Sequence, residues 1–354
     1  MKRPPPAPPS ELVPVLPEWS ALHVQRYQYL SDQQYMLEDQ RRTGAYHRGI
    51  THNRLDFEGR TVLDVGAGTG ILSLFAAQAG ARKVYAVEHT TCADHARRLV
   101  RANGMSDRVE VIQSSLIDLV LPEKVDVIIS EPWGFFLFHE RMVEAFVIAR
   151  DRHLRAGGRM FPGQARVWLA PFVDPELHQA RISQAHFWLQ KNFYGVDLTP
   201  LAEAAEDELF WMPMLGHVPP KTLMAEPVGA DFDFEKLPLG SLAEITLPFE
   251  FAAARSGAVH GFAGWFDVIF DGASETVVLS TSPQAAQTHW AQLRFVLADP
   301  IPVDEGQKLQ GSLVLRANAQ SSYTAELNVS VEGVGALRPR TFGLHGYSWW
   351  EDTD

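Results

Sequence analysis

The pattern of apolar residues changes once along this chain, near residue 165, and that change constrains the fold more than any other feature. Before it, the short apolar runs TVLDV, KVYAV, RVEVI and VDVIIS alternate with segments of helical pattern. After it, strand-like runs such as RVWLAPF and WFDVIF follow one another, separated by turn residues. Alternating strands and helices predict a doubly wound α/β domain with a parallel sheet. Successive strands predict a mostly antiparallel β-barrel or sandwich.

These patterns divide the chain into three parts. The proline-rich residues 1–18 are expected to form a disordered arm, because proline fixes φ and removes hydrogen-bond donors. Residues 19–162 should hold N-terminal helices and the α/β domain, and residues 163–354 the β domain. A helical stretch rich in aromatic residues, about 175–210, interrupts the β pattern and is expected to form a separate arm.

The composition excludes several classes of protein. The 354 residues are 46% hydrophobic and can bury a large core, and the single cysteine, Cys92, excludes a disulfide scaffold and indicates a reducing compartment, cytoplasmic or nuclear. No apolar run is long enough for a membrane span, and the N-terminus lacks the apolar run of a secretory signal. The net charge of −12 disfavours direct nucleic-acid binding and suits a basic partner. No metal is expected, because the histidines show no ligand spacing.

The strongest local motif is a glycine-rich loop between a predicted strand and a predicted helix. It runs Asp64-Val-Gly66-Ala-Gly68-Thr-Gly70, and Glu88 ends the following strand. Glycines let the backbone approach a ligand closely beside a helix N-terminus. A carboxylate in the position of Glu88 can accept both hydroxyls of a ribose. The loop therefore predicts a cofactor that contains a nucleoside.

Two cofactors compete for this loop. A dinucleotide site usually has the spacing G-x-G-x-x-G, but here the third glycine comes one residue early, and Asp64 would repel a pyrophosphate. An acid suits a ligand with an ammonium group, such as S-adenosylmethionine, which carries an α-amino group and a sulfonium. We therefore favour S-adenosylmethionine over NAD, and a purely structural turn is the third interpretation.

A second motif, SEPWGFFLFHERM, begins where the VDVIIS strand ends. Because ligands of open α/β sheets bind outside the carboxyl ends of the strands, Glu131 should lie at the cofactor mouth, with Glu140 nine residues on. Two carboxylates in an apolar pocket repel each other. We therefore expect a cationic substrate, best an arginine, whose planar guanidinium binds carboxylates through two parallel hydrogen bonds. Taken without other motifs, a helix-start acid and a surface acid explain the pair equally well.

A helix is predicted before the glycine loop. Ser31 and Gln34 match a capping box at its start. Asp39 and Arg42 follow at positions that share one helical face. From this spacing alone, an ion pair between Asp39 and Arg42 along a solvated face is an alternative to any role in a site.

Taken together, these motifs resemble the protein arginine methyltransferases over about residues 20–335. The segment VLDVGAGTGILSLFAAQAGARKVYAVE resembles the family's cofactor motif, and SEPWGFFLFHERM its double-glutamate loop. MLEDQRRTGAYHRGI is similar to the helix that closes over the cofactor, FWLQKNFYGVDL to the dimerisation arm, and VHGFAGWFDVIF and LSTSPQAAQTHW to barrel strands. The resemblance implies a doubly wound S-adenosylmethionine-binding domain, followed by an antiparallel β-barrel domain with a helical dimerisation arm.

The resemblance also implies residue roles. The implied cofactor-binding residues are Gln33, Arg42, Asp64, Gly66, Gly68, Glu88 and Asp118. The implied catalytic residues are the substrate-clamping Glu131 and Glu140 and the acid–imidazole pair Asp39 and His289, and the substrate pocket is implied to hold Met36, Trp133 and Tyr27. Arg42 should pair with the carboxylate of the cofactor. Asp118 is expected to replace an acid that the family has one position earlier, where this chain has Ile117. Taken alone, His289 is more often a core histidine.

The activity that the family implies is methyl transfer from S-adenosylmethionine to a guanidino nitrogen of arginine in proteins. The implied substrates are arginine-rich proteins, such as RNA-binding proteins or histones, and the implied assembly is a homodimer. A catalytically weak regulatory partner of another arginine methyltransferase is the alternative.

Two sequence features bear on which methylated arginine the enzyme is expected to form. The Thr-His-Trp loop that contains His289 implies asymmetric rather than symmetric dimethylation. Trp133 stands where the family has Met, so we hypothesise that its indole narrows the pocket and largely restricts the enzyme to monomethylation. Outward packing of Trp133 on the loop aromatics is the alternative.

Overall fold

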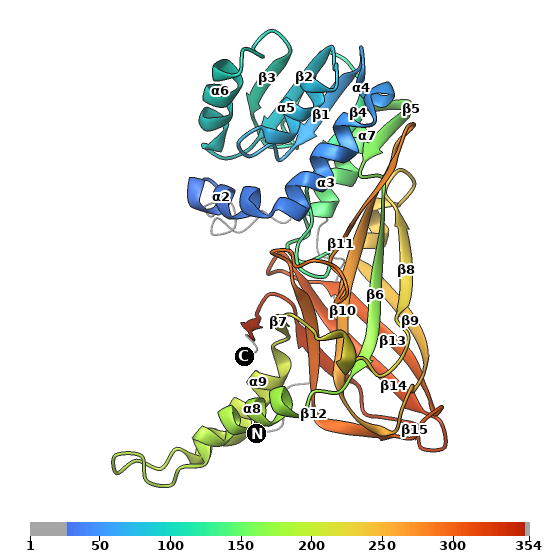
Figure 1. The fold of residues 1–354 in the computed structure, drawn as a ribbon. Helices are drawn as coiled ribbons and strands as arrows, with labels where there is room; N and C mark the ends of the chain where they lie inside the picture. Colours follow the sequence, from blue (N-terminus) through green and yellow to red (C-terminus); the bar gives the residue numbers. More distant parts are fainter. Residues whose placement is uncertain (1–26, 351–354) are drawn as a thin grey trace.

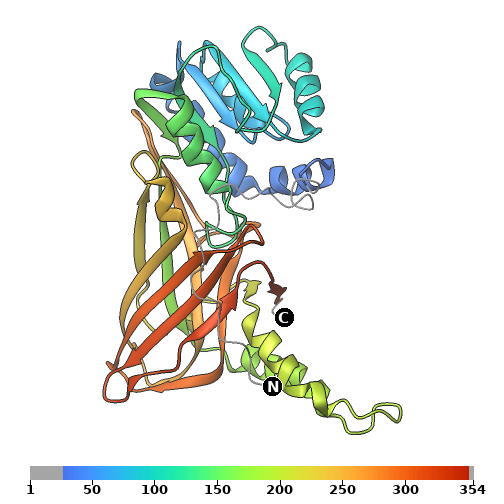
Figure 2. The same cartoon turned by 180° about the vertical axis from the view of Figure 1, so that it is seen from behind.

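The computed structural model describes residues 27–350, so the arm expected at 1–18 lies outside the described residues. Figure 1 shows two bodies joined end to end: a sheet flanked by helices at the top and a barrel of long strands below. Helices α8 (Pro175–His186) and α9 (Ala202–Trp211) form an arm that projects sideways from the barrel, as the views from front and back both show (Figures 1 and 2).

The upper body contains a five-stranded parallel sheet in the order β3–β2–β1–β4–β5. Its strands are β1 (Thr61–Val65), β2 (Lys83–Glu88), β3 (Val109–Gln113), β4 (Val125–Ser130) and β5 (Leu154–Phe161). Every residue of β1 is buried, as expected for a central strand of a parallel sheet. The direction in which strands are added reverses between β1 and β4, and α/β sheets bind their ligands at such a reversal.

Helices flank this sheet (Figure 1). They are α3 (Gln40–Thr51), α4 (Arg54–Phe57), α5 (Ile71–Gln78), α6 (Cys92–Ala102) and α7 (Met142–His153). Gly80 and Gly104, just beyond α5 and α6, have φ values of +97° and +67°, which glycine adopts without strain. A glycine therefore marks the end of each of these two helices.

Two β-sheets build the lower body. One has the order β17–β7–β12–β10–β6–β8, with β11 beside β10, and the other β15–β14–β13–β9, with β16 beside β14. All neighbours are antiparallel except β17 and β7. The strands are β6 (Gln164–Phe172), β7 (Met214–Gly216), β8 (Val228–Asp233), β9 (Glu244–Ala252), β10 (Gly257–Asp271), β11 (Thr276–Ser280), β12 (Gln292–Val303), β13 (Lys308–Ala317), β14 (Tyr323–Val331), β15 (Gly335–Ala336), β16 (Arg340–Gly343) and β17 (Ser348–Trp349). Strand β9 alternates buried and exposed residues along its whole length, so one face lines the barrel core.

The first described helix, α2 (Leu30–Glu38), differs from the prediction. No side chain caps its start, and the Gln34 amide donates to Glu38 instead of completing a capping box. The expected box of Ser31 and Gln34 is therefore wrong.

The predicted continuation of this helix through Asp39 is also wrong. The backbone leaves the helical conformation at Asp39, whose carboxylate accepts the N–H groups of Arg41 and Arg42 and so caps the start of α3. Asp39 therefore joins two helices, and it does not pair with the Arg42 side chain on a solvated face.

None of the helices between residues 27 and 350 is long and apolar enough to cross a membrane. Within the same residues, no three His, Cys, Asp or Glu side chains are grouped as metal ligands would be.

Candidate active site

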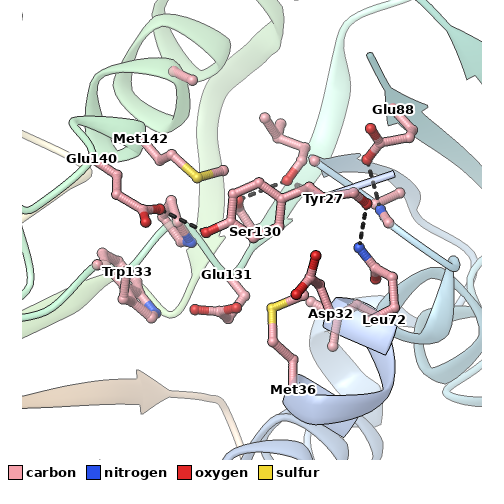
Figure 3. A pocket seen from close by; sticks show the side chains of 18 of the residues that line it. Tyr27, Asp32, Met36, Leu72, Glu88, Ser130, Glu131, Trp133, Glu140 and Met142 are labelled. Carbon is pink, nitrogen blue, oxygen red and sulfur yellow. Dashed lines mark hydrogen bonds between the residues drawn. The ribbon is translucent and has the colours of Figure 1, made fainter. Parts of the chain in front are cut away.

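A cavity of about 250 Å³ lies between the two bodies, at the carboxyl ends of β1, β2 and β4. Helix α2 covers one side of it, and the loop after β4 forms another (Figure 3). We call residues 27–39, which contain α2, the lid. Eleven of the residues predicted for the site line the cavity: Tyr27, Gln33, Met36, Arg42, Gly66, Gly68, Glu88, Glu131, Trp133, Glu140 and His289. Of the other three, Asp39 and Asp64 lie directly behind lining residues and Asp118 lies elsewhere.

The glycine-rich loop forms the floor of the cavity. Gly66, Gly68 and Gly70 have φ values of +70°, +54° and +83°, so the loop needs glycine for its backbone. A Cβ atom on Gly68 would also lie 2.5 Å from Oε1 of Gln33 on α2. The lid helix and the loop therefore touch across the cavity.

Glu88 is held at the end of β2 by backbone groups. Its Oε2 accepts the N–H of Gly68 at 2.9 Å, and its Oε1 accepts the N–H of Thr90 at 2.7 Å. Because a carboxylate has about four lone-pair sites, these two bonds fix its orientation and leave acceptor capacity. The side chain can accept further hydrogen bonds from a ligand in the cavity.

Asp64 lies under the glycine loop instead of lining the cavity. It is fully buried, and its Oδ2 accepts the Ser73 hydroxyl at 2.6 Å. Its Oδ1 has no hydrogen-bond partner among residues 27–350. Burial raises the pKa of Asp64 to about 7, although the hydrogen bonds from Ser73 oppose the change. A buried carboxylate with an unused oxygen suits a cationic group bound above the loop.

Arg42 and Glu131 form a buried ion pair. Nε and Nη2 of Arg42 both donate to Oε2 of Glu131, at 3.1 and 2.6 Å, and both side chains are less than a tenth exposed. Oε1 of Glu131 is buried and has no hydrogen-bond partner in the described part of the chain. One oxygen of this carboxylate is thus anchored within the protein and the other is open to a donor in the cavity. The sequence did not predict this pairing of Arg42.

Tyr27 bridges the lid and the second carboxylate. Its hydroxyl donates to Oε2 of Glu140 at 2.7 Å, and its carbonyl accepts the amide of Gln33 at 2.9 Å (Figure 3). Met36 projects from α2 toward Glu131 in the same view. The lid therefore reaches both carboxylates.

The loop that carries Glu140 is strained. Its residues with left-handed φ are Phe136, Leu137, Glu140 and Arg141. Such conformations persist only where the surroundings hold them. The fully buried Arg141 guanidinium donates two hydrogen bonds to Glu144 and one to the carbonyl of Asn318, between β13 and β14. These bonds fasten the loop to the barrel and aim Glu140 at the cavity.

Asp39 and His289 join the lid to the barrel. Oδ2 of Asp39 accepts both the backbone N–H and Nδ1 of His289, at 2.9 and 2.8 Å. Burial alone would raise the pKa of Asp39, but hydrogen bonds from His289 and from backbone N–H groups outweigh it and hold the pKa at about 2. An ionised carboxylate can only accept hydrogen bonds, so Nδ1 of His289 carries a proton. Nε2 is therefore the ring nitrogen that can take up a second proton.

Trp133 contributes to the cavity wall, but its indole is turned into the core. The indole N–H donates to the Tyr46 hydroxyl at 2.7 Å, the ring packs against Phe146 and Phe234, and the residue is 5% exposed. The alternative of outward packing on the loop aromatics is therefore wrong. The structure also gives no support to an indole that narrows the pocket.

Asp118 is outside the cavity, so its expected role in cofactor binding is not supported. It is exposed, and its carboxylate accepts the Ser115 hydroxyl at 2.6 Å. Ser114 and Leu116 line the cavity at this edge instead. Ile117 and Asp118 both lie in an exposed turn, so neither side chain at this position reaches the cavity.

Sequence reasoning missed two barrel residues that line the cavity, Ser321 and Tyr347. Ser321 is 4% exposed with a φ of +54° in the loop between β13 and β14, and Tyr347 precedes β17. Neither belongs to a motif. Only the positive φ of Ser321 marks it, and that is visible in the structure alone.

Two family models match the chain. Residues 163–332 match the arginine methyltransferase oligomerization subdomain, and residues 50–166 match the methyltransferase small domain.

Curated relatives are similar over most of the chain. The probable histone-arginine methyltransferase CARM1 of Oryza sativa subsp. indica is 47% identical over 313 residues, which cover 88% of this chain and 59% of the relative. The histone-arginine methyltransferase CARMER of Drosophila yakuba is 44% identical over 322 residues, 91% of this chain and 61% of the relative. The chain thus spans about three-fifths of the length of these relatives.

Solved structures are similar over nearly their whole length. The crystal structure of Arabidopsis thaliana protein arginine methyltransferase 10 has a TM-score of 0.84 and 36% identity, covering 90% of this chain and 99% of the other. The Trypanosoma brucei PRMT1 enzyme–prozyme heterotetrameric complex with AdoHcy gives a TM-score of 0.82 and 31% identity, with the same coverage.

Proposed function

The chain belongs to the protein arginine methyltransferase family, and from this we propose that it transfers a methyl group from S-adenosylmethionine to a guanidino nitrogen of arginine residues in proteins. The observation that carries the proposal is the pair Glu131 and Glu140, two carboxylates at one cavity beside a glycine-rich loop. Arg42 pairs with Oε2 of Glu131, but Oε1 of that residue and the carboxylate of Glu140 stay at the cavity, where they suit a cationic ligand such as the guanidinium of arginine.

The residues at the floor and lid fit S-adenosylmethionine. We propose that Glu88 binds the ribose and that the cofactor lies close to the backbone of Gly66 and Gly68. Its ammonium group would lie on the loop directly above the buried Asp64. Arg42 keeps N–H groups beyond those bound to Glu131 and Met36, so it can hold Glu131 and a cofactor carboxylate together.

The two carboxylates act on the guanidinium. When bound, S-adenosylmethionine supplies an electrophilic methyl group on a sulfonium. Oε1 of Glu131 and the carboxylate of Glu140 bind the nitrogens that do not react, which fixes the plane of the guanidinium and directs the third nitrogen at the methyl group. Most of the rate acceleration then comes from orientation and from electrostatic preorganisation.

Two bases face the cavity and can take the proton that the nitrogen loses. They are the carboxylate of Glu140 and Nε2 of His289. Asp39 holds His289 in orientation through Nδ1 and stabilises the imidazolium that would form. Tyr27 must give up its bond to Glu140 when the substrate arrives.

We propose monomethylarginine followed by asymmetric dimethylarginine as products. Because the indole of Trp133 points into the protein core, it does not fill the space in the cavity that a methylated nitrogen needs. The alternative of a catalytically weak regulatory partner is not favoured, because Glu131, Glu140, Asp39 and His289 are all present and three of them line the cavity.

We propose a homodimer that acts on arginine-rich proteins such as histones or RNA-binding proteins, in the nucleus or the cytoplasm. The arm beyond α8 exposes apolar side chains, with Tyr194 94% and Val196 58% exposed. The names of the relatives support histones as one substrate class. Sedimentation of the wild type and of Tyr194→Glu tests the assembly: a dimer that the variant weakens supports it, and a wild-type monomer at micromolar concentration contradicts it.

A methyl-transfer assay tests the function. The purified chain is incubated with labelled S-adenosylmethionine and a peptide rich in arginine and glycine, and a matched peptide with lysine for arginine is the control. Transfer to the arginine peptide alone is expected. Absence of transfer, with normal cofactor binding, contradicts the proposal.

A further inference from the structure

The C-terminal strand β17 brings aromatic side chains to the mouth of the cavity. Tyr347 lines the cavity, and its ring lies edge-on to Phe135, with centroids 5.1 Å apart. Trp349, half-exposed at 51%, lies 6.1 Å from the same Phe135 ring and 6.4 Å from Tyr347. Phe135 is four residues from Glu131, so this cluster adjoins the substrate side of the site.

Strand β17 is held in place by β7 and by α8. It pairs in parallel with β7, and the Trp350 N–H donates to the Leu215 carbonyl at 2.8 Å. The buried Arg181 of α8 donates to the Ser348 hydroxyl at 3.0 Å and to the Met212 carbonyl at 2.9 Å. In Figure 1 the strand lies beside β7, below α2, on the side from which the arm projects. The aromatic cluster is therefore a preorganised surface.

We propose that Phe135, Tyr347 and Trp349 form a subsite that binds the side chain of a second basic residue, next to the target arginine in the substrate. The subsite rests on the proposed function, which supplies the target arginine at Glu131 and Glu140. Aromatic faces attract the guanidinium of Arg and the ammonium of Lys. An exposed indole is the strongest of these partners, and Trp349 provides one.

The charge of the chain favours a cation over an apolar side chain at this subsite. The net charge is −12, and the acidic residues Glu351, Asp352 and Asp354 follow Trp350 directly in the sequence. A negative surface increases the local concentration of a basic peptide and orients its approach. An apolar neighbour would gain contact with the rings but nothing from this charge.

A set of peptides with one arginine tests the subsite. Lys, Leu or Gly is placed at each of the three positions on either side of a single arginine in a glycine-rich peptide, so that only one residue accepts a methyl group. Binding is measured by calorimetry and turnover by kcat/KM. We expect Lys to improve wild-type binding about tenfold over Gly, and over Leu, at one or two positions.

Substitution of Trp349 decides whether the cluster causes this preference. Trp349→Ala should reduce the preference for Lys over Gly to about twofold or less, and Trp349→Phe should keep part of it. Leu55→Ala, which truncates a 67% exposed side chain on α4, is the control and should keep the full preference. Equal preference for Leu and Lys, or a Lys preference that survives Trp349→Ala, overturns the proposal.

The same set separates this inference from the function on which it rests. If no peptide is methylated, the proposed function fails, while the binding data still show whether the cluster selects a cation. If methylation occurs without selection, only the subsite fails.

Discussion

The cofactor side and the substrate side of the cavity are built in different ways. The cofactor side comes from adjacent strand ends of one parallel sheet, and its key contact joins Gly68 to Glu88, twenty residues apart. The substrate side is assembled from the lid, the loop after β4 and the barrel, through hydrogen bonds that span up to 250 residues. The sheet therefore forms the floor of the cofactor side, to which the lid adds Gln33 and α3 adds Arg42. The substrate side depends throughout on contacts between parts that are distant in the sequence. Substitutions that remove those long-range hydrogen bonds should affect methyl transfer far more than cofactor binding.

Glu131→Gln should have the largest effect. Glutamine keeps the shape but loses the charge that holds both Arg42 and the substrate guanidinium, so kcat should fall at least ~10²–10³-fold. The cofactor dissociation constant, measured by calorimetry, should change by less than about fivefold because the glycine loop is untouched. Glu275→Gln, in an exposed pair with Arg48, is the matched control and should leave kcat unchanged. Near-normal turnover by Glu131→Gln would sink the proposed mechanism.

Asp39→Asn should have the next largest effect. It removes the charge that orients His289 and weakens the connection between lid and barrel, so kcat should fall about 10- to 100-fold. Asp118→Asn is the control, since Asp118 is exposed and outside the cavity, and it should leave both kcat and cofactor affinity unchanged. If Asp118→Asn weakened cofactor binding, the role that sequence resemblance gave it would be restored.

The pH dependence of cofactor binding tests the floor of the cavity. The pKa of Asp64 is about 7, so below that pH the carboxyl keeps its proton and offers no charge to a cationic ligand. Affinity should therefore rise as the pH approaches ~7, by about tenfold in total, and then level off. Asp64→Asn should abolish this slope and bind about tenfold more weakly at pH 8. A slope that persists in Asp64→Asn would assign the titration to another group.

The stability of the ligand-free protein should follow the opposite course. The folded-state pKa of Asp64 lies above its ordinary value of 3.8, so the unfolded chain loses its proton first as the pH rises. This group's contribution is complete below pH ~4 and is lost between pH ~4 and ~7. Denaturant midpoints of wild type and Asp64→Asn across that range should diverge accordingly.

The same contrast explains what the sequence predicted. The strands from β1 to β4 coincide with short, mostly apolar runs, and the glycine-rich loop follows β1, so local pattern indicated the sheet and the position of that loop. Strand β5, with the sequence LRAGGRMF, was not predicted, because two central glycines interrupt its pattern and its place is set by pairing with β4. Pairing of this kind depends on tertiary contacts that no short window contains.

On the substrate side, the sequence indicated residues but not their connections. Glu131 and Glu140 were expected from their motif, but their partners were not. Glu131 binds Arg42, which is 89 residues away, and Glu140 binds Tyr27, which is 113 residues away. The break at Asp39 was missed although its carboxylate caps α3 through local hydrogen bonds, because the continuous helical spacing from Tyr35 to Arg42 concealed the cap. Tyr347 was missed because it reaches the cavity only through the pairing of β17 with β7.

Trp133→Met should have the smallest effect on the reaction, and it tests the last hypothesis drawn from the sequence. The indole packs against Phe146 and Phe234 and donates to Tyr46, so the shorter side chain should leave the shape of the pocket nearly unchanged. Mass spectrometry of a singly arginine-containing peptide at high enzyme and long times should show asymmetric dimethylarginine for wild type and variant alike, in ratios within about twofold. The lost core packing should instead lower the free energy of unfolding by about 2–3 kcal/mol, measured with denaturant. If the wild type stops at monomethylarginine and the variant forms the dimethyl product at least tenfold faster, the indole restricts the pocket after all. The shape of the substrate side is then set by one core residue as well as by the long-range hydrogen bonds.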